Sequence, residues 1–212
     1  MVANSSFESV SGKLDTPFLD FHTLTEQPVQ MAQQWFNDAV EAKVREPRSM
    51  VLTTANSQHI MSSRVMAVMS FSEEGVTFAT HSCSRKINDV NDNPLACGHF
   101  YWKELGRQLS LSGYVSRLPH EVAQSAWDRR PVPLHSMSTV SHQSEPLICD
   151  KELRQAAIVL EEKGPLPCPD RFEVYLLKPI HIEFWAASSD RLHRRVHFEL
   201  SSSGWSGVWL QP

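Results

Sequence analysis

From residue 50 onward, apolar and polar side chains alternate with a period of two over much of the chain, which is the pattern of strands with one buried face. In residues 108–117, for example, Leu109, Leu111 and Val115 point to one side of a predicted strand. Such segments predict about nine strands, at residues 50–55, 63–69, 76–81, 95–102, 108–117, 172–178, 180–186, 191–199 and 204–210. Most of them lie close enough in sequence to pair as antiparallel hairpins.

Helical patterns interrupt the strands. They predict helices at residues 28–46, 84–93, 119–130 and 150–160. Residues 132–149 are rich in Ser, His, Thr and Gln and are expected to form a polar loop. Strands and helices in this order indicate an α+β protein built on a closed antiparallel β-barrel with peripheral helices. A Rossmann fold is disfavoured, because the chain has no Gly-x-Gly-x-x-Gly motif and no βαβ alternation.

The N-terminal segment differs in composition from the rest of the chain. Residues 1–24 carry many small polar residues and no clear period, so we expect a flexible N-terminal arm, and residues 25–212 are expected to form a single domain.

The formal charge of −4 gives no reason to expect a nucleic acid or an anionic membrane as partner. We find no apolar run of membrane-spanning length and no signal-peptide pattern, so a cytoplasmic location is expected. Neither a Cys-x-x-Cys pair nor a close Cys/His cluster occurs, and no metal site is predicted.

Two basic segments could bind an anion. Ser84-Arg85-Lys86 stands where a helix should begin, and a helix start offers unpaired N–H groups and the positive end of the dipole. Taken alone, a solvated basic turn is the more probable explanation of these three residues. Arg64 opens an apolar strand, which fits either an anion site or an ordinary arginine at a sheet edge.

Two glutamines are weaker candidates. Gln108 begins a regular strand, and its amide can both donate and accept hydrogen bonds, which suits the polar edge of a flavin ring. Gln143-Ser144 lies in the predicted polar loop, and long loops in compact domains are often functional. The alternative for Gln108 is a solvated glutamine at a strand edge, and the alternative for Gln143-Ser144 is a disordered loop.

The last candidate group follows Glu183-Phe184-Trp185. If residues 191–199 form a strand, Arg191, His193 and Arg195 point to the same side. Three cationic or potentially cationic groups on one face are tolerable when an anion lies among them. An exposed basic strand face is the slightly less favoured alternative.

The order and spacing of these segments resemble the pyridoxine/pyridoxamine 5′-phosphate oxidase family. The resemblance covers residues 30–212 and depends on Ser63-Arg64, Ser84-Arg85-Lys86, Arg107-Gln108, Arg130-Pro131, Gln143-Ser144, Glu183-Phe184-Trp185, Arg191-Leu192-His193 and the terminal Trp209-Leu210-Gln211-Pro212. It implies a split β-barrel that binds flavin mononucleotide (FMN), and a homodimer with FMN at the subunit interface. By matching position it implies an FMN site made of Arg64, Val65, Thr80, Arg85, Lys86, Gln108, Gln143, Ser144, Trp185 and Arg195.

The substrate side departs from the vitamin B6 enzymes. The family's Lys, Tyr and Ser, which hold the substrate phosphate, are replaced here by Met69, Ala126 and Leu134, and Arg130 is retained. Each lost hydrogen bond to a charged group is worth about 1.5–3 kcal/mol, so recognition of a phosphorylated substrate should be severely weakened. Arg191 and His193 remain, which implies that the substrate still carries an anionic group.

Residues 130–145 and the Thr80-His81 pair are similar to one branch of the family, the flavin-dependent oxidases of phenazine biosynthesis. The resemblance implies oxidation of reduced tricyclic phenazine carboxylic acids to the aromatic phenazine, with O2 as acceptor and H2O2 as product. Arg130 and Arg191 would then hold the carboxylate, and His193 would share this role or accept a proton. Two alternatives stay open: a pyridoxine/pyridoxamine 5′-phosphate oxidase, and a non-enzymatic flavin- or haem-binding module.

Overall fold

The structure is a computed structural model that describes residues 12–13, 15–20 and 24–212. Its eight strands form one antiparallel sheet in the order β3-β2-β1-β4-β5-β6-β7-β8. The strands are β1 (Ser49–Ala55), β2 (Met61–Ser72), β3 (Gly75–His81), β4 (Leu95–Trp102), β5 (Arg107–Arg117), β6 (Phe172–Ala186), β7 (Arg194–Ser201) and β8 (Gly204–Leu210). The helices are α1 (Pro28–Glu41), α2 (Arg85–Asp92), α3 (His120–Asp128), α4 (Pro133–Val140) and α5 (Asp150–Glu161).

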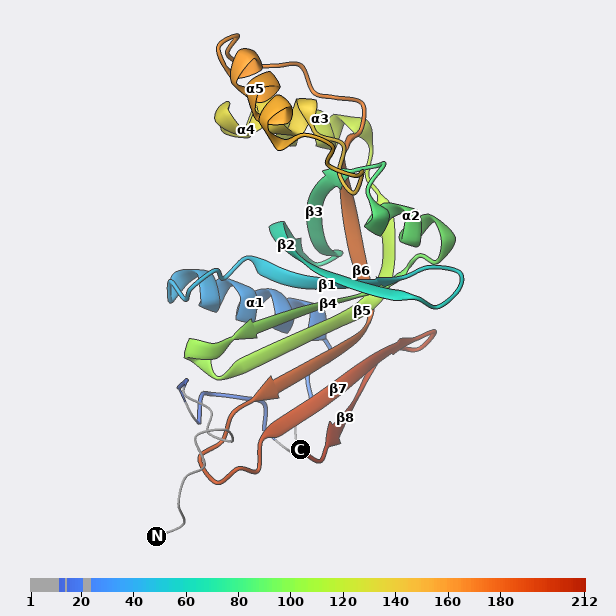
Figure 1. The fold of residues 1–212 in the computed structure, drawn as a ribbon. Helices are drawn as coiled ribbons and strands as arrows, with labels where there is room; N and C mark the ends of the chain where they lie inside the picture. Colours follow the sequence, from blue (N-terminus) through green and yellow to red (C-terminus); the bar gives the residue numbers. More distant parts are fainter. Residues whose placement is uncertain (1–11, 14, 21–23) are drawn as a thin grey trace.

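Strand β6 closes the barrel because its two halves pair with different neighbours. Its first half pairs with β3 and its second half with β7, while β5 pairs along both halves. The change falls near Pro179, which has no backbone N–H and lies opposite Gly113 of β5. The result is a six-stranded barrel, β3-β2-β1-β4-β5-β6, from which β7 and β8 extend (Figure 1). The predicted split antiparallel barrel with peripheral helices is confirmed.

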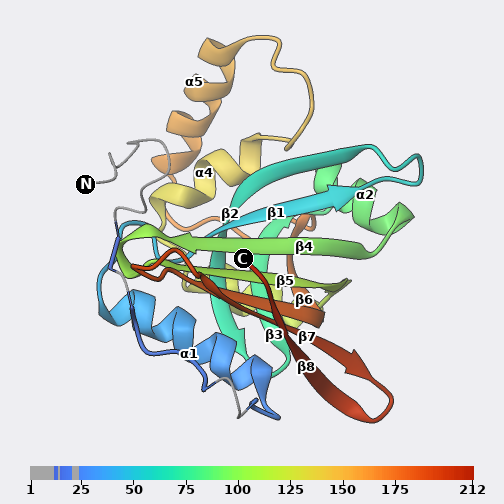
Figure 2. The same ribbon diagram turned by 90° about the horizontal axis from the view of Figure 1, so that it is seen from below.

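The helices lie at different places around the barrel. Helices α3, α4 and α5 gather at the end away from β7 and β8, while α1 lies on another side (Figures 1 and 2). The apolar face of α1 completes the main core, with the Trp35 ring 5.0 Å from Phe184 and the Phe36 ring 5.8 Å from Phe100. A smaller apolar cluster, Ala123, Trp127, Phe172 and Val174, lies between α3 and β6. None of the described helices is long and apolar enough to span a membrane.

The helix prediction was wrong in two places. Helix α1 ends at Glu41 rather than near residue 46, because Lys43 and Glu46 adopt φ values of 52° and 54°, outside the helical region. Helix α4 occupies part of the predicted loop 132–149. Its buried His135 ring stacks 4.3 Å from the Trp127 ring, and its Nε2 donates to the Trp127 carbonyl oxygen at 3.2 Å. This contact with α3 orders the segment, and no periodicity in the sequence reports it.

Two strand predictions also need correction. The predicted strands 172–178 and 180–186 are one strand, β6, which continues through the irregularity at Pro179. Strand β7 begins at Arg194, not at residue 191, because the preceding segment is a turn. In that turn Arg191 has a φ of 66°, and the Asp190 carboxylate accepts hydrogen bonds from the Leu192 N–H and the Ser188 hydroxyl.

Part of the predicted N-terminal arm contacts the body of the chain. The Lys13 N–H donates to the Glu104 carbonyl oxygen at 2.9 Å, and the Phe18 ring lies between Trp35 and Trp209. The predicted flexibility of the arm falls largely on residues 1–11, 14 and 21–23, which lie outside the described residues.

Candidate active site

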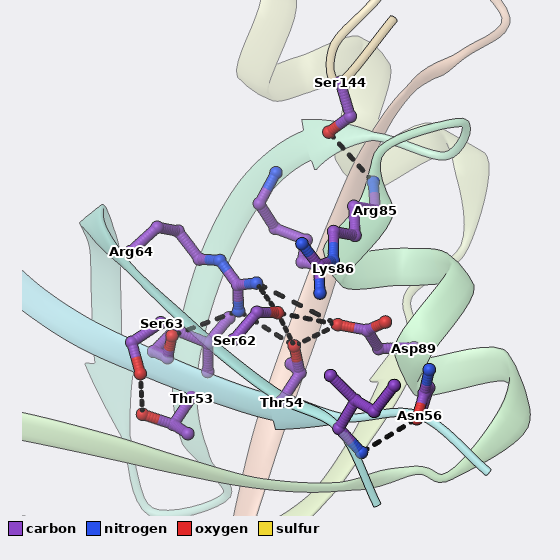
Figure 3. A network of polar contacts seen from close by, with 12 residues as sticks. Thr53, Thr54, Asn56, Ser62, Ser63, Arg64, Arg85, Lys86, Asp89 and Ser144 are labelled. Atoms are coloured by element: carbon purple, nitrogen blue, oxygen red, sulfur yellow. Dashed lines mark hydrogen bonds and ion pairs between the residues drawn. The ribbon is translucent and has the colours of Figure 1, made fainter. Parts of the chain in front are cut away.

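The first group of candidate residues lies where β2, β3 and α2 meet (Figure 3). Arg64 of β2 donates hydrogen bonds to the Leu52 carbonyl oxygen and the Thr54 hydroxyl, at 3.1 and 2.9 Å. The Asp89 carboxylate of α2 lies 3.9 Å from the Arg64 guanidinium and accepts from the Thr54 and Ser62 hydroxyls. Arg64 is therefore held in one orientation by strands and helix together.

Lys86 brings β3 and the loop after α4 into the same group. Its Nζ donates to the Thr80 hydroxyl at 2.9 Å and to Gln143 Oε1 at 3.3 Å, and the Thr80 hydroxyl donates to Gln143 Oε1 at 2.7 Å. Burial lowers the pKa of Lys86 to about 8, and the nearby positive charge of Arg64 adds to this effect. A second cation beside a half-buried ammonium is an arrangement that an anion would stabilise.

The start of α2 is tied to the same loop. The Arg85 backbone N–H donates to the Ser144 hydroxyl at 3.0 Å, and Ser144 itself has a φ of 75° (Figure 3). The structure therefore brings together six of the predicted FMN-binding residues. We call this set the first half-site: Arg64, Thr80, Arg85, Lys86, Gln143 and Ser144. Its three cations and two hydroxyls are chemically suited to a phosphate monoester.

Most of the substrate-side candidates lie around the small apolar cluster between α3 and β6. Met69 and Ala126 pack against the small cluster that contains Trp127 and Phe172. The Arg130 guanidinium lies 5.5 Å from the Phe172 ring centre and donates to the Ser138 hydroxyl at 3.1 Å. Burial lowers the pKa of Arg130. The protein therefore offers Arg130 beside an apolar wall here, and Arg171 donates to the carbonyl oxygen of the same Ser138.

Two further residues belong to this region. Leu134, the remaining substrate-side candidate, lies on α4 and is 48% exposed. His81, at the end of β3, is buried, and its pKa is lowered to about 4 by burial and then by the charges of Arg171 and Lys86. The side chain of His81 is therefore neutral near pH 7. The charges of Lys86 and Arg130 both act on His81, so His81 lies near both residues.

A second group lies on the outer face of the sheet. Gln108, Trp185 and Arg195 are direct neighbours across β5, β6 and β7. They line a pocket of about 240 Å³ whose full lining is His99, Gln108, Ser110, Glu183, Trp185, His193, Arg195 and Pro212. Arg195 donates to Glu183 Oε1 through Nε and Nη2, at 3.0 and 2.7 Å. We call Gln108, Trp185, His193 and Arg195 the second half-site.

The proposed face of Arg191, His193 and Arg195 is only partly as predicted. Arg191 lies in the turn before β7, so the argument from a shared strand face is wrong for it. His193 and Arg195 nevertheless line the same pocket. The His193 ring lies 4.8 Å from the Trp185 ring, and its Nδ1 accepts from the Ser188 N–H at 3.2 Å. A more apolar pocket of about 420 Å³, with Leu192 and Trp209 in its lining, adjoins this one and shares His193.

The two half-sites point to opposite sides of the sheet. The row of directly paired positions that starts at Arg64 crosses β1 and β4 and reaches the fully buried Leu111 of β5 and Ile182 of β6. The side chain of Arg64 therefore faces the inside of the barrel. Gln108 is an odd number of residues away from Leu111 along β5, so its side chain points to the opposite, outer face of the sheet. Val65, the residue after Arg64, also faces outward and is 65% exposed. Within the described chain, the 240 Å³ pocket includes no residue of the first half-site.

Sequence reasoning missed Asp89 and His99. Asp89 orients Arg64 from a different element, and His99 reaches the second pocket because β4 pairs with β5. No local pattern marks either residue, since the packing of α2 against β1 and β2 places Asp89 and strand register places His99.

A split barrel with a basic site suited to a phosphate and an aromatic, polar pocket on its outer face defines the class of flavin-binding oxidoreductases of this fold. The chain belongs to the pyridoxamine 5′-phosphate oxidase family: the family model of that description matches residues 36–147. A second model, the pyridoxine 5′-phosphate oxidase C-terminal dimerisation region, matches residues 172–212.

Two kinds of enzyme are among the most similar relatives. The dihydrophenazinedicarboxylate synthase of Burkholderia lata is 42% identical over 98% of this chain and 99% of its own length. The pyridoxine/pyridoxamine 5′-phosphate oxidase of Aliarcobacter butzleri is 33% identical over 96% and 98% of the two chains. The crystal structure of PhzG from Burkholderia lata in complex with tetrahydrophenazine-1-carboxylic acid superposes with a TM-score of 0.91 at 40% identity, covering 95% of this chain and all of that one.

Proposed function

We propose that the protein is an FMN-dependent oxidase that aromatises reduced tricyclic phenazine carboxylic acid precursors, with O2 as acceptor and H2O2 as product. The observation that carries this proposal is the apolar wall of Met69 and Ala126 beside the Arg130 guanidinium. Such a wall suits a flat ring system with a carboxylate better than a small phosphate ester. The 42% identity to a dihydrophenazinedicarboxylate synthase supports the same reading. Residues 25–212 act as a single FMN-binding domain in this proposal.

The first half-site fits the phosphate of FMN. Lys86, Arg85 and Arg64 would hold it, with Ser144 as an additional hydroxyl. Gln108, Trp185 and Arg195 would contact the ring system from the second half-site. The chemistry that bound FMN supplies is the transfer of two electrons from the reduced ring system to O2, with two protons completing H2O2.

We infer that the active unit is a homodimer with FMN at the subunit interface. Phosphate-binding and ring-binding residues lie on opposite faces of the sheet of one chain, so the first half-site of one subunit would be completed by the second half-site of the other. The match to a C-terminal dimerisation region supports this arrangement. The outer face also exposes apolar side chains, among them Val51, Val65 and Tyr101, as an interface requires.

The residues that would act on the substrate are Arg130, Arg191 and His193. Arg130 and Arg191 would fix the carboxylate by charge and hydrogen bonding. The Nδ1 of His193 accepts a hydrogen bond from the Ser188 N–H, so in the neutral ring the proton lies on Nε2. A proton on Nε2 makes His193 a donor to the substrate and leaves it no lone pair there to accept a proton. Aromatisation is downhill, so we assign His193 to binding.

Replacing His193 by Ala tests that assignment. We expect the KM for a reduced phenazine carboxylic acid to rise about tenfold or more, because a hydrogen bond to a charged group is lost. We expect kcat to change by no more than about twofold, because the reaction needs no base at this position. Steady-state oxygen uptake measures both constants, and His197→Ala is the matched control, since His197 lies outside both pockets. A large loss of kcat at unchanged KM would instead assign proton transfer to His193.

The function itself is tested by anaerobic mixing of the purified yellow protein with two substrates. We expect a reduced phenazine carboxylic acid to bleach the flavin rapidly and pyridoxine 5′-phosphate to leave it yellow. Bleaching by the phosphate ester alone would establish a vitamin B6 enzyme with an altered site for the substrate phosphate. Bleaching by neither, with FMN firmly bound, would point to a non-enzymatic flavin-binding module.

A further inference from the structure

His99 occupies a central place in the second half-site although no expected flavin-binding position includes it. It lies on β4, opposite Ser110 of β5, which in turn lies opposite Glu183 of β6. Its side chain lines the 240 Å³ pocket together with Gln108 and Trp185. Any ring system bound against Gln108 and Trp185 would therefore lie next to the His99 imidazole.

We assign the proton of the His99 ring from its contact with Ser110. His99 Nδ1 lies 2.7 Å from the Ser110 hydroxyl oxygen. Among the described residues this is the hydrogen bond that the Ser110 hydroxyl makes, so its O–H hydrogen is satisfied when it donates to Nδ1. Nδ1 then accepts, and the proton of the neutral ring lies on Nε2. Burial lowers the pKa of His99, with Glu183 opposing the shift, so the ring is neutral at pH 7.

The Nε2–H group of His99 has no acceptor within the described part of the chain. In the pocket carboxylate Glu183, Oε1 accepts two hydrogen bonds from Arg195, and Oε2 lies 3.9 Å from the Nδ1 of His197. The pocket lining therefore carries the Gln108 amide and the His99 Nε2–H as donors, beside those of His193 and Arg195. A half-buried donor of this kind gains most from an acceptor on a ligand.

We propose that His99, oriented by Ser110, is a further cofactor-binding residue that donates a hydrogen bond from Nε2 to an acceptor atom of the FMN isoalloxazine ring. This inference rests on the FMN site of the proposed function. The ring offers carbonyl oxygens and unprotonated nitrogens as acceptors. The expected ring-binding residues Gln108, Trp185 and Arg195 lie on β5, β6 and β7, and His99 adds one residue from the neighbouring strand β4.

The test compares FMN affinity in three variants of the holoprotein, without any substrate. The dissociation constant is obtained from released-FMN fluorescence on serial dilution. We expect His99→Leu to raise it about tenfold, the loss that one hydrogen bond to a buried group produces. We expect His99→Gln, whose amide N–H can replace Nε2–H, to stay within about threefold of the wild type. His181→Leu is the matched control, because it removes a half-buried histidine from the same sheet face, outside the pocket.

The outcomes separate the two proposals. Unchanged FMN affinity in His99→Leu would overturn the inference and leave the proposed function intact. Equal weakening by His99→Leu and His181→Leu would overturn it too, because the effect would then belong to the sheet face in general. If His99→Gln binds FMN as weakly as His99→Leu, a hydrogen bond is not what His99 contributes, and the inference is overturned. A wild-type protein that binds no FMN would instead contradict the proposed function.

Discussion

The Lys86→Met protein is expected to lose its yellow colour during purification. Lys86 would supply the FMN phosphate with a half-buried positive charge, fixed by Thr80 and Gln143. Loss of one charge-assisted contact of about 1.5–3 kcal/mol raises the FMN dissociation constant about 10- to 150-fold. Flavin absorbance per protein and the dissociation constant for FMN measure the effect. Lys151→Met, an exposed position on α5, is the matched control and should retain flavin.

The same residue predicts how FMN affinity depends on pH. Because the pKa of Lys86 is lowered to about 8, the unliganded protein loses this cation as the pH rises from 7 to 9. Above that pKa, the FMN dissociation constant should rise by up to about tenfold per pH unit, while the phosphate remains a dianion. Lys86→Arg stays charged over this range and should show a flat profile. A flat profile in the wild type would mean that Lys86 does not bind the phosphate.

Lys86→Met also tests the interface. Mixed with an Arg195→Met protein and allowed to exchange subunits, it should regain flavin in one of the two sites of each heterodimer. That result is expected because the intact first half-site of one subunit would then face the intact second half-site of the other. If both half-sites act within one chain, mixing restores nothing.

Gly113→Ala is expected to lower the free energy of unfolding by about 3 kcal/mol, near the upper end for overpacking in a core. A Cβ atom at Gly113 would lie 1.9 Å from the Lys178 carbonyl oxygen and 2.7 Å from the Pro179 Cα. Both are backbone atoms of β6, so they can move aside only if β5 and β6 separate. For a chain of this length the loss corresponds to a decrease in Tm of about 6–12 °C.

Gly164→Ala is the matched control for Gly113→Ala. Gly164 has a φ of 78°, but a Cβ atom there would meet nothing within 4 Å. Its replacement therefore costs about 1 kcal/mol of backbone strain without any clash. Urea unfolding of both variants separates the two effects. Equal losses of stability would show that β6 tolerates a side chain where it changes partner.

Local pattern was enough for most elements. Strands β4 and β8 were predicted with the observed bounds, because alternating side chains run between clear turn residues at both ends. The short helix before Asn93-Pro94 was also predicted, since Ser84 marks its start and Pro94 its end. Those same local signals identified Arg85 and Lys86 as candidates for phosphate binding.

Elements that depend on tertiary contacts were not predictable in this way. The sequence around Pro179 reads as a break between two strands, because a proline cannot complete a regular ladder. In the structure the strand continues, because Gly113 leaves room for the irregularity. Helix α4 is another case, since the stacking of His135 on Trp127 orders a segment whose composition resembles a loop.

The sequence by itself determined the alternating strands, the helix starts and the chemical types available for a flavin site. These properties depend on side-chain period and on capping, which are set within a few residues. The tertiary structure alone decided that β6 changes partner, that Asp89 orients Arg64, and that His99 enters the pocket of Gln108. Strand register and helix packing bring residues tens of positions apart into contact, and no local interaction encodes either of them.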